Sequence, residues 1–208
     1  MTSIESVTLE VADLTAADRF YTALGLGTQV RLRASEAPTN GFRGFSLSLT
    51  VARPADVNAF VGAALDAGAT TLKPASKSFW GYGGVVRAPD GTILKLASSE
   101  KKDTGPATRE IEQLVLLLGV ADMAESRKFY VGQGLVVAKS YGRKYVEFAA
   151  GRGPLKLALY GRRALAKDVG VPADGTGSHR LVLGGGAGAF TDPDGYAWEA
   201  VATPAAAA

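Results

Sequence analysis

An internal repeat constrains this chain more than any other feature of its sequence. The stretch VADLTAADRFYTALGL at residues 11–26 is matched by VADMAESRKFYVGQGL at residues 120–135, at a constant offset of 109 residues. A Pro-Asp-Gly turn also occurs twice, at residues 89–91 and 193–195. A period of this length indicates the duplication of a domain-sized unit.

The segment between the two copies has the composition of a linker. Residues 99–110, SEKKDTGPATRE, are polar and include Gly105-Pro106. We therefore expect one domain at residues 1–98 and a second at residues 111–203. The alanine-rich end, residues 204–208, is expected to be disordered.

Hydrophobic periodicity divides each half into modules. Residues 45–98 read as strand, helix and three strands, and residues 112–160 read in the same way. The outer quarters are shortened: residues 4–44 offer a strand, a helix and one strand, and residues 178–203 offer strands without a helix. Residues 162–170, RRALAKDVG, read as a short surface helix.

Composition excludes several functional classes. The chain has no cysteine, so disulfides and thiolate metal sites are excluded. A net charge of +3, without basic stripes interleaved with aromatic residues, argues against nucleic-acid binding. The longest apolar run is too short to cross a bilayer, and the start of the chain lacks the basic and apolar regions of a signal peptide. We expect a cytoplasmic monomer or homodimer.

A repeated β-α-β-β-β module with V-x-D, then F-Y, then L-G, closing on P-D-G, resembles the vicinal oxygen chelate superfamily. That superfamily includes glyoxalase I, extradiol dioxygenases, and the bleomycin- and fosfomycin-resistance proteins. The resembling stretches cover most of the chain. The resemblance implies an α+β fold in which tandem glyoxalase-like modules form open barrels around a cavity.

The resemblance also implies where metal ligands would lie, on the first and fourth strands of each module. Two of these positions in this chain carry opposite charges, because Glu199 follows one Pro-Asp-Gly turn and Lys95 follows the other. A protonated lysine has no lone pair for a metal and repels a cation. The positions carried over are Ser6, Ser46, Lys95, Val115, about Leu157, His179 and Glu199.

Two pairings of the four modules are open, and they differ in the cavity that they build. Pairing of the two complete inner modules would give one intact barrel, lined by Ser46, Lys95, Val115 and Leu157, which could not chelate a metal. Pairing of neighbours in the sequence would leave each barrel with one shortened half. We favour the inner pairing.

A metal-free cavity of this kind resembles the antibiotic-binding branch of the superfamily, so we expect a small organic ligand and no cofactor. Aromatic side chains suit such a role, because they bury a large area at modest entropic cost. Lys95 would meet an anionic group, and Tyr160, out of phase with Leu157, is expected to face the helix. The residues predicted to bind the ligand are Ser46, Ser48, Trp80, Tyr82, Lys95 and Leu157.

Two other functions stay open at this point. The first is a glyoxalase-type lyase or isomerase, or a dioxygenase, that uses a divalent metal (Zn, Ni, Mn or Fe) held by His179, Glu199 and Glu10. Glu199 would then also move a proton. Against this, His179 and Glu199 are only two of the three or four ligands that such a metal requires. The second is a degenerate member of the superfamily that serves as an interaction module.

Overall fold

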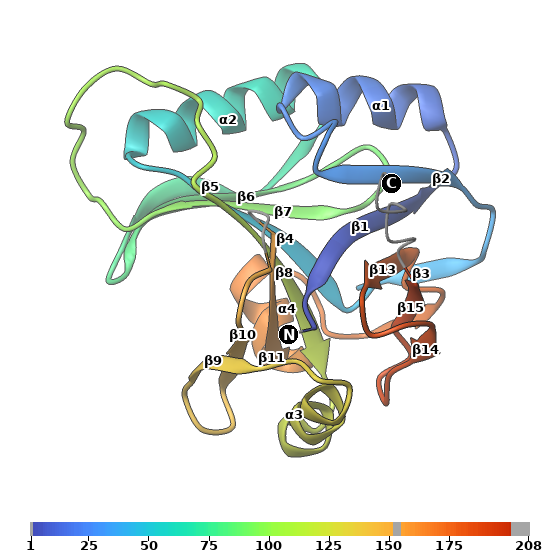
Figure 1. Cartoon of the computed structure of the whole chain (residues 1–208). Coiled ribbons are helices and arrows are strands. Elements are labelled where there is room, and N and C mark those ends of the chain that lie inside the picture. The colour runs from blue at the N-terminus through green and yellow to red at the C-terminus, as the bar shows by residue number, and fades with distance from the viewer. Residues whose placement is uncertain (1, 152–154, 201–208) are drawn as a thin grey trace, which may run out of the picture.

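The computed structural model describes residues 2–151 and 155–200 (Figure 1). The tail predicted to be disordered lies outside these residues. In chain order the elements are β1 (Ile4–Val11), α1 (Leu14–Ala23), β2 (Val30–Ala34), β3 (Thr39–Gly41), β4 (Phe45–Thr50), α2 (Pro54–Asp66), β5 (Thr70–Ser78), β6 (Gly81–Arg87), β7 (Ile93–Ser98), β8 (Gln113–Val120), α3 (Met123–Gly132), β9 (Val137–Ser140), β10 (Tyr145–Phe148), β11 (Leu155–Gly161), α4 (Arg162–Val169), β12 (Gly175–Gly177), β13 (Leu181–Gly185), β14 (Phe190–Thr191) and β15 (Ala197–Ala200).

The strands form two main open sheets and a short ribbon. The inner sheet has eight strands in the order β5-β6-β7-β4-β8-β11-β10-β9, and the outer sheet has five in the order β14-β15-β13-β1-β2. Strands β12 and β3 form the two-stranded ribbon. The predicted α+β class is confirmed.

The two complete modules build the inner sheet, as the favoured pairing predicted. Their first strands, β4 and β8, pair antiparallel, while β1 and β13 of the shortened modules pair antiparallel in the outer sheet. Each sheet therefore draws strands from both sides of residues 99–110. The division of the chain into two domains stays a prediction.

The shortening of the first module has a simple structural form. In the inner modules the first strand lies parallel to the last, β4 beside β7 and β8 beside β11. In the first module β2 follows α1 directly and lies parallel to β1 in the corresponding place. The two strands that are missing are those that would extend the sheet outwards from this position.

The repeated V-x-D motif begins the first helix of each half. The Asp13 carboxylate accepts from the backbone N–H of Ala16, and the Asp122 carboxylate accepts from those of Ala124 and Glu125. Both aspartates have an extended backbone conformation. Their side chains accept hydrogen bonds from N–H groups that have no partner within the first helical turn. The motif is thus a helix cap.

The repeated F-Y motif reaches the Pro-Asp-Gly regions. The Tyr21 hydroxyl on α1 lies 3.2 Å from a carboxylate oxygen of Asp90, in the turn between β6 and β7. The Tyr130 hydroxyl on α3 donates at 2.7 Å to Asp192, two residues before the second turn's aspartate. Each tyrosine therefore joins a helix of one module to a turn of the next.

The helix predicted at residues 162–170 exists, but the expectation of a surface position is wrong. Helix α4 packs on the face of the inner sheet opposite to α2, where Leu165, Ala166 and Val169 are fully buried. They contact Phe42, Val85 and Ile93 in a second, smaller core. An apolar stripe of this kind on one side of a helix requires a covering surface, which the sheet supplies.

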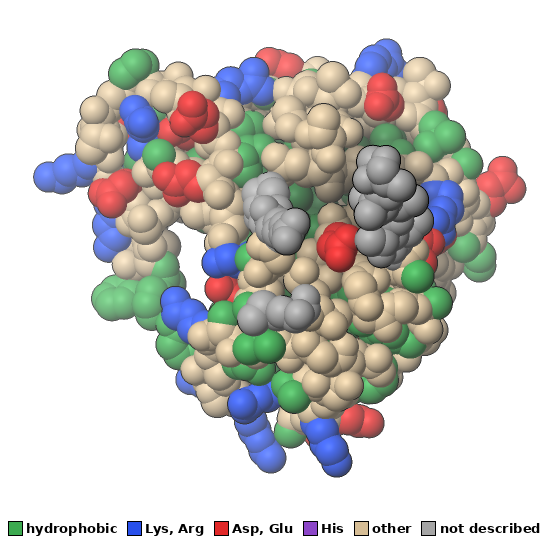
Figure 2. Space-filling model, in the orientation of Figure 1, with side chains coloured by type: hydrophobic (Ala, Val, Ile, Leu, Met, Phe, Trp, Pro, Cys, Tyr) green, Lys and Arg blue, Asp and Glu red, His purple; other side chains and the backbone are tan. Residues whose placement is uncertain are grey.

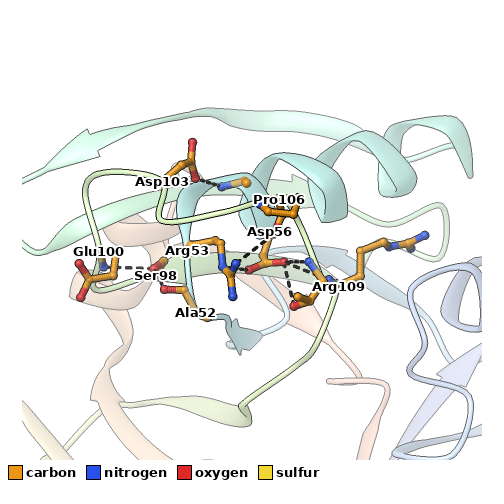
Figure 3. Close-up of polar contacts among 10 residues, drawn as sticks. Ala52, Arg53, Asp56, Ser98, Glu100, Asp103, Pro106 and Arg109 are labelled. Atoms are coloured by element: carbon orange, nitrogen blue, oxygen red, sulfur yellow. Dashed lines mark hydrogen bonds and ion pairs between the residues drawn. The ribbon is translucent and has the colours of Figure 1, made fainter.

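Residues 99–110 wrap around the start of α2 (Figure 3). The Asp103 carboxylate accepts from the N–H of Ala55, and the carbonyl of Pro106 accepts from Arg53. The carboxylate of Asp56, whose side chain is fully buried, accepts from the N–H groups of Thr108 and Arg109 at 2.6 and 3.0 Å.

Asp56 is also charge-paired with Arg53, whose Nε lies 3.2 Å from the carboxylate without hydrogen-bond alignment. Burial by itself would raise the pKa of Asp56. The N–H groups of Arg109 and Thr108 and the charge of Arg53 outweigh that effect, so the pKa lies below its ordinary value. The segment is fixed to α2 by a buried charge.

We expect Asp56→Asn to lower the free energy of unfolding by about 1–3 kcal/mol at neutral pH, because an amide cannot pair with Arg53 and accepts fewer hydrogen bonds. A carboxyl group with a lowered native pKa stabilises the fold above its unfolded pKa of about 3.9, and loses this effect as the pH falls through the native value. Denaturant melts between pH 7 and pH 3 should therefore show the two proteins converging in acid. A constant difference across this range would contradict the role of the charge.

We expect Tyr130→Phe to destabilise the fold more than Tyr21→Phe. Removing the Tyr130 hydroxyl leaves the buried Asp192 without that donor and the Trp198 indole N–H without its acceptor, at a cost of about 1–3 kcal/mol. Both carboxylates keep other donors, Asp90 from Thr92 and Asp192 from the N–H groups of Asp194 and Tyr196, so the lost acceptor of Trp198 makes the difference. Thermal or urea unfolding of the two variants measures the difference, and equal losses would contradict it.

Candidate functional site

A cavity of about 700 Å³ lies against the inner sheet. Its walls come from the β5–β6 hairpin, from the β9–β10 hairpin, from β7 and β8, and from the end of β11 and helix α4. Its size falls in the range that holds small organic ligands. It is lined by Trp80, Lys95, Leu117, Lys139, Tyr141, Lys144, Tyr145, Glu147, Tyr160 and Asp168.

Strand register decides which side chains face this cavity. Ser48 lies opposite Val115 on one side and Lys95 on the other. Val115 in turn lies beside Lys156. Since side chains opposite each other in paired strands share a face, the position expected for Leu157 belongs to Lys156.

Leu157 and Tyr160 exchange their expected roles. Leu157 lies beside Leu116, is 1% exposed, and belongs to the helix-covered core. Tyr160 lies on the other face and lines the cavity. Leu155, Leu157 and Leu159 alternate with Lys156, Ala158 and Tyr160, but this alternation does not say which of the two faces is covered by the helices and which faces the cavity.

Lys95 lines the cavity, but its charge is already paired. Its Nζ lies 2.6 Å from the carboxylate of Asp168 on α4. Nearby, Glu147 accepts from Lys156 at 3.1 Å and from the hydroxyl of Tyr145 at 2.8 Å. Both carboxylates of the cavity wall therefore have their own positive or hydroxyl partners.

The cavity retains an excess of positive charge. Lys139 and Lys144, from the β9–β10 hairpin, have no carboxylate partner among the described residues. The Lys139 ammonium lies over the ring of Tyr141, 5.6 Å from its centre. Burial, together with Glu147, raises the pKa of Tyr145 strongly, so this side chain stays a neutral hydroxyl donor.

The aromatic pair at the tip of the β5–β6 hairpin is strongly exposed. Phe79 and Trp80 are 81% and 84% exposed, and their rings meet edge to face. Figure 2 shows hydrophobic atoms projecting at the left, where Figure 1 places this hairpin, beside a hollow in the molecule. Only Trp80 of the two lines the cavity.

Two further residues predicted to bind the ligand lie elsewhere. Tyr82 is directed towards α2, where its hydroxyl donates to Asn58 at 2.9 Å, so it does not line the cavity. Ser46 is fully buried beneath α4, and its hydroxyl has no hydrogen-bond partner among the described residues. Ser48 lies on the same face as Lys95 but does not line the cavity.

In the outer sheet a guanidinium lies between the two carboxylates that were candidates for a metal. Arg33 donates from Nη2 to both oxygens of Glu199, at 3.0 and 2.8 Å. Its Nη1 lies 3.8 Å from Glu10. A positive side chain therefore already pairs with Glu199 and lies close to Glu10.

His179 is held by the backbone. Its Nδ1 lies 2.5 Å from the carbonyl oxygen of Arg43, its Nε2 lies 3.1 Å from that of Asp194, and its ring stacks on Tyr196 at 4.1 Å. Arg180 adopts a left-handed φ of 50°, so the chain turns between His179 and the start of β13. His179 thus falls outside the strand alternation that placed it at a ligand position.

These donors do not fit a metal. The two ring nitrogens are engaged with carbonyls, and the carboxylates share Arg33. Throughout residues 2–151 and 155–200, no group of three histidine, aspartate or glutamate side chains is arranged to hold an ion.

No protein-family model matches this sequence, and no curated protein matches it. Solved structures do. Glyoxalase I from Zea mays is similar with a TM-score of 0.62 and 16% identity, over 97% of this chain and 92% of that chain. A putative dioxygenase from Bacillus subtilis is similar with a TM-score of 0.53 and 13% identity, over 92% and 71%. The chain has the glyoxalase fold.

The fold that the resemblance implied is therefore confirmed across nearly the whole chain. At such low identity the comparison shows architecture and leaves chemistry to the residues. Among the described residues, no helix combines the length and the hydrophobicity needed to cross a membrane.

Several cavity residues could not be found from the repeat. Lys139, Tyr141, Lys144 and Glu147 lie on a hairpin that the module pattern predicted only as strands, and Asp168 lies on a helix outside that pattern. The density of lysine and tyrosine at residues 139–145 was the available signal.

We expect His179→Ala to lower the free energy of unfolding by about 1–3 kcal/mol, because the ring stack and a hydrogen bond from the ring to a backbone carbonyl are lost. Elemental analysis should show the same metal content in the variant and in the parent protein. Glu199→Gln is the control, since it weakens an exposed ion pair worth less than about 1 kcal/mol. Loss of one equivalent of metal with unchanged stability would overturn this assignment.

Proposed function

We propose that this protein binds a small organic molecule in the cavity of the inner sheet, without using a metal. The observation that carries the proposal is the cavity itself, which is large enough for such a ligand and is walled by four aromatic side chains, Trp80, Tyr141, Tyr145 and Tyr160. Aromatic faces hold flat ligands by stacking and by burial of apolar area.

The charge of the wall supports an anionic ligand. Lys95 was expected to meet the anion, but Asp168 already pairs with it. That role passes to Lys139 and Lys144, at the cavity wall and without a carboxylate partner among the described residues. A flat molecule bearing a carboxylate or sulfonate would place its ring among the tyrosines and its charge beside these lysines.

The residue chemistry favours binding over lyase or isomerase activity. The ligand positions that the resemblance implies in the inner modules carry Ser46, Lys95 and Val115, and the strand register puts Lys156 in the place expected for Leu157. Neither a protonated lysine nor a valine can act as a metal ligand. In the outer sheet Arg33 lies between the two carboxylates and is hydrogen-bonded to Glu199.

An interaction module is the competing hypothesis, and one observation favours it. Phe79 and Trp80 together expose a large apolar surface at the tip of one hairpin. Exposed aromatic side chains of this kind mark contact sites on many proteins. The two residues separate the hypotheses, because only Trp80 lines the cavity.

The test is calorimetric titration with 8-anilinonaphthalene-1-sulfonate, an aromatic anion. We expect saturable binding near one equivalent that is weakened roughly tenfold by Trp80→Leu and by a Lys139→Gln/Lys144→Gln double variant. Phe79→Leu is the matched control and should bind as the parent protein does.

Two results would contradict the proposal. No saturable binding of this probe or of naphthalene carboxylates would remove the ligand site. Equal weakening by Phe79→Leu and Trp80→Leu would place the contact on the exposed hairpin surface, as the interaction hypothesis expects.

A further inference from the structure

A second, smaller cavity of about 160 Å³ lies where the β3 region meets the turn between β6 and β7. It is separate from the cavity of the proposed function and shares no lining residue with it. Two arginines, from different elements, contribute to its wall. It is lined by Thr39, Asn40, Gly41, Phe42, Arg43, Phe45, Arg87, Gly91, Thr92 and Ile93.

Arg43 forms no ion pair with a carboxylate among the described residues. Its Nη2 donates to the carbonyl oxygen of Asp90 at 2.5 Å, while its Nη1 is shielded from solvent and has no hydrogen-bond partner among the described residues. A buried, unsatisfied donor on a charged group costs more than one on a neutral group. Burial lowers the pKa of Arg43, the charge of Asp90 opposes this effect, and the charges of Arg180 and Arg87 lower the pKa further.

The surrounding arginines are held by neutral acceptors. Arg180 donates to the carbonyl of Ala37 at 2.9 and 2.6 Å, and Arg162 donates to the carbonyl of Phe42 at 2.7 Å. A carbonyl oxygen satisfies a hydrogen bond but does not cancel a charge. Positive charge therefore accumulates around residues 37–44.

The carboxylate of Asp90 is near enough to Arg43 to interact with its charge, but it already accepts several hydrogen bonds. Asp90 accepts from the hydroxyl of Tyr21 and from the hydroxyl and N–H of Thr92. Arg87 has no carboxylate partner in the part of the chain that the structure describes. A water molecule in the cavity could accept a hydrogen bond, but it would leave the paired arginine charges uncompensated.

We propose that this cavity binds a phosphate group, held between Arg43 and Arg87. Guanidinium groups match the oxygen spacing of phosphate and form charge-assisted hydrogen bonds with it. The hydroxyl of Thr39 and the amide of Asn40, also on the wall, are available types of donor. The phosphate group is either the free inorganic ion or part of a small phosphomonoester.

The site lies at a junction that matters to the fold. The β3–β12 ribbon connects residues 39–41 with residues 175–177, and Asp90 joins the β6–β7 turn to α1 through Tyr21. An anion that neutralises Arg43 here would stabilise the native state by binding to it and not to the unfolded chain.

The first test is a thermal-unfolding titration with potassium phosphate, at an ionic strength held constant with potassium chloride. We expect a saturable rise of the melting temperature with phosphate, and isothermal calorimetry should give a matching dissociation constant. Arg87→Gln, which changes an exposed side chain, should weaken phosphate binding about tenfold or more. Arg127→Gln, at an exposed position of α3, is the matched control and should bind as the parent protein does.

A second variant tests whether phosphate binding depends on the guanidinium group or only on positive charge. Arg43→Lys retains the charge but removes the planar guanidinium, so it should also weaken phosphate binding while circular dichroism shows a folded protein. The absence of a saturable effect, or equal affinity in the parent and Arg87→Gln proteins, would overturn the proposal.

Glycerol 3-phosphate in the same assay separates the two sources of the group. Binding of the ester as tightly as the ion assigns the site to a phosphorylated metabolite, and binding of inorganic phosphate alone assigns it to the free ion. The outcome is independent of the proposed function, because Trp80→Leu should leave phosphate affinity unchanged.

Discussion

Two hydrogen bonds between a tyrosine hydroxyl and an aspartate join the inner sheet to the outer sheet. The tyrosine of each F-Y pair lies on a helix and reaches the aspartate region of a turn in the next module, Tyr21 to Asp90 and Tyr130 to Asp192. Because the first and fourth modules form the outer sheet and the second and third form the inner sheet, each contact couples one sheet to the other. The second is the more deeply buried, and a hydrogen bond to a charged group in such a place is costly to remove.

These contacts explain why two motifs far apart in each half have both been retained. The Pro-Asp-Gly sequence gives a tight turn, as its residues predict. Its surroundings also supply the carboxylate that a helix one module earlier requires. In the second half two aspartates accept hydrogen bonds from α3. Asp192 accepts from the hydroxyl of Tyr130, and Asp194 accepts from the hydroxyl of Ser126. These hydrogen bonds involve the turns and the helices, and they place no requirement on the residue types that follow the turns.

Divergence has occurred at those residues beyond the turns. Lys95 and Glu199 carry opposite charges at corresponding places, and each is neutralised by a side chain of the opposite sign, Asp168 and Arg33. A metal site needs several lone-pair donors directed at one point. Here Lys95 and Glu199 are each held in an internal ion pair, and the space that opens against the inner sheet is bounded by aromatic side chains and lysines instead.

Local patterns in the sequence determined the modules, the helix caps, the turns and the fold class, because caps, periodicity and turn residues act within a few positions of the chain. The repeat also predicted which modules pair, since only the inner two are complete. The facing of β11 was decided only by the structure, because its leucines alternate regularly but both faces of the sheet are covered. The position of His179 was decided there too, because the left-handed residue Arg180 breaks the strand alternation next to it. The partners of Lys95, Glu199 and Arg43 were also decided only by tertiary structure. Asp168, Arg33 and Asp90 lie between 47 and 166 positions away along the chain, and nothing local specifies contacts over such separations.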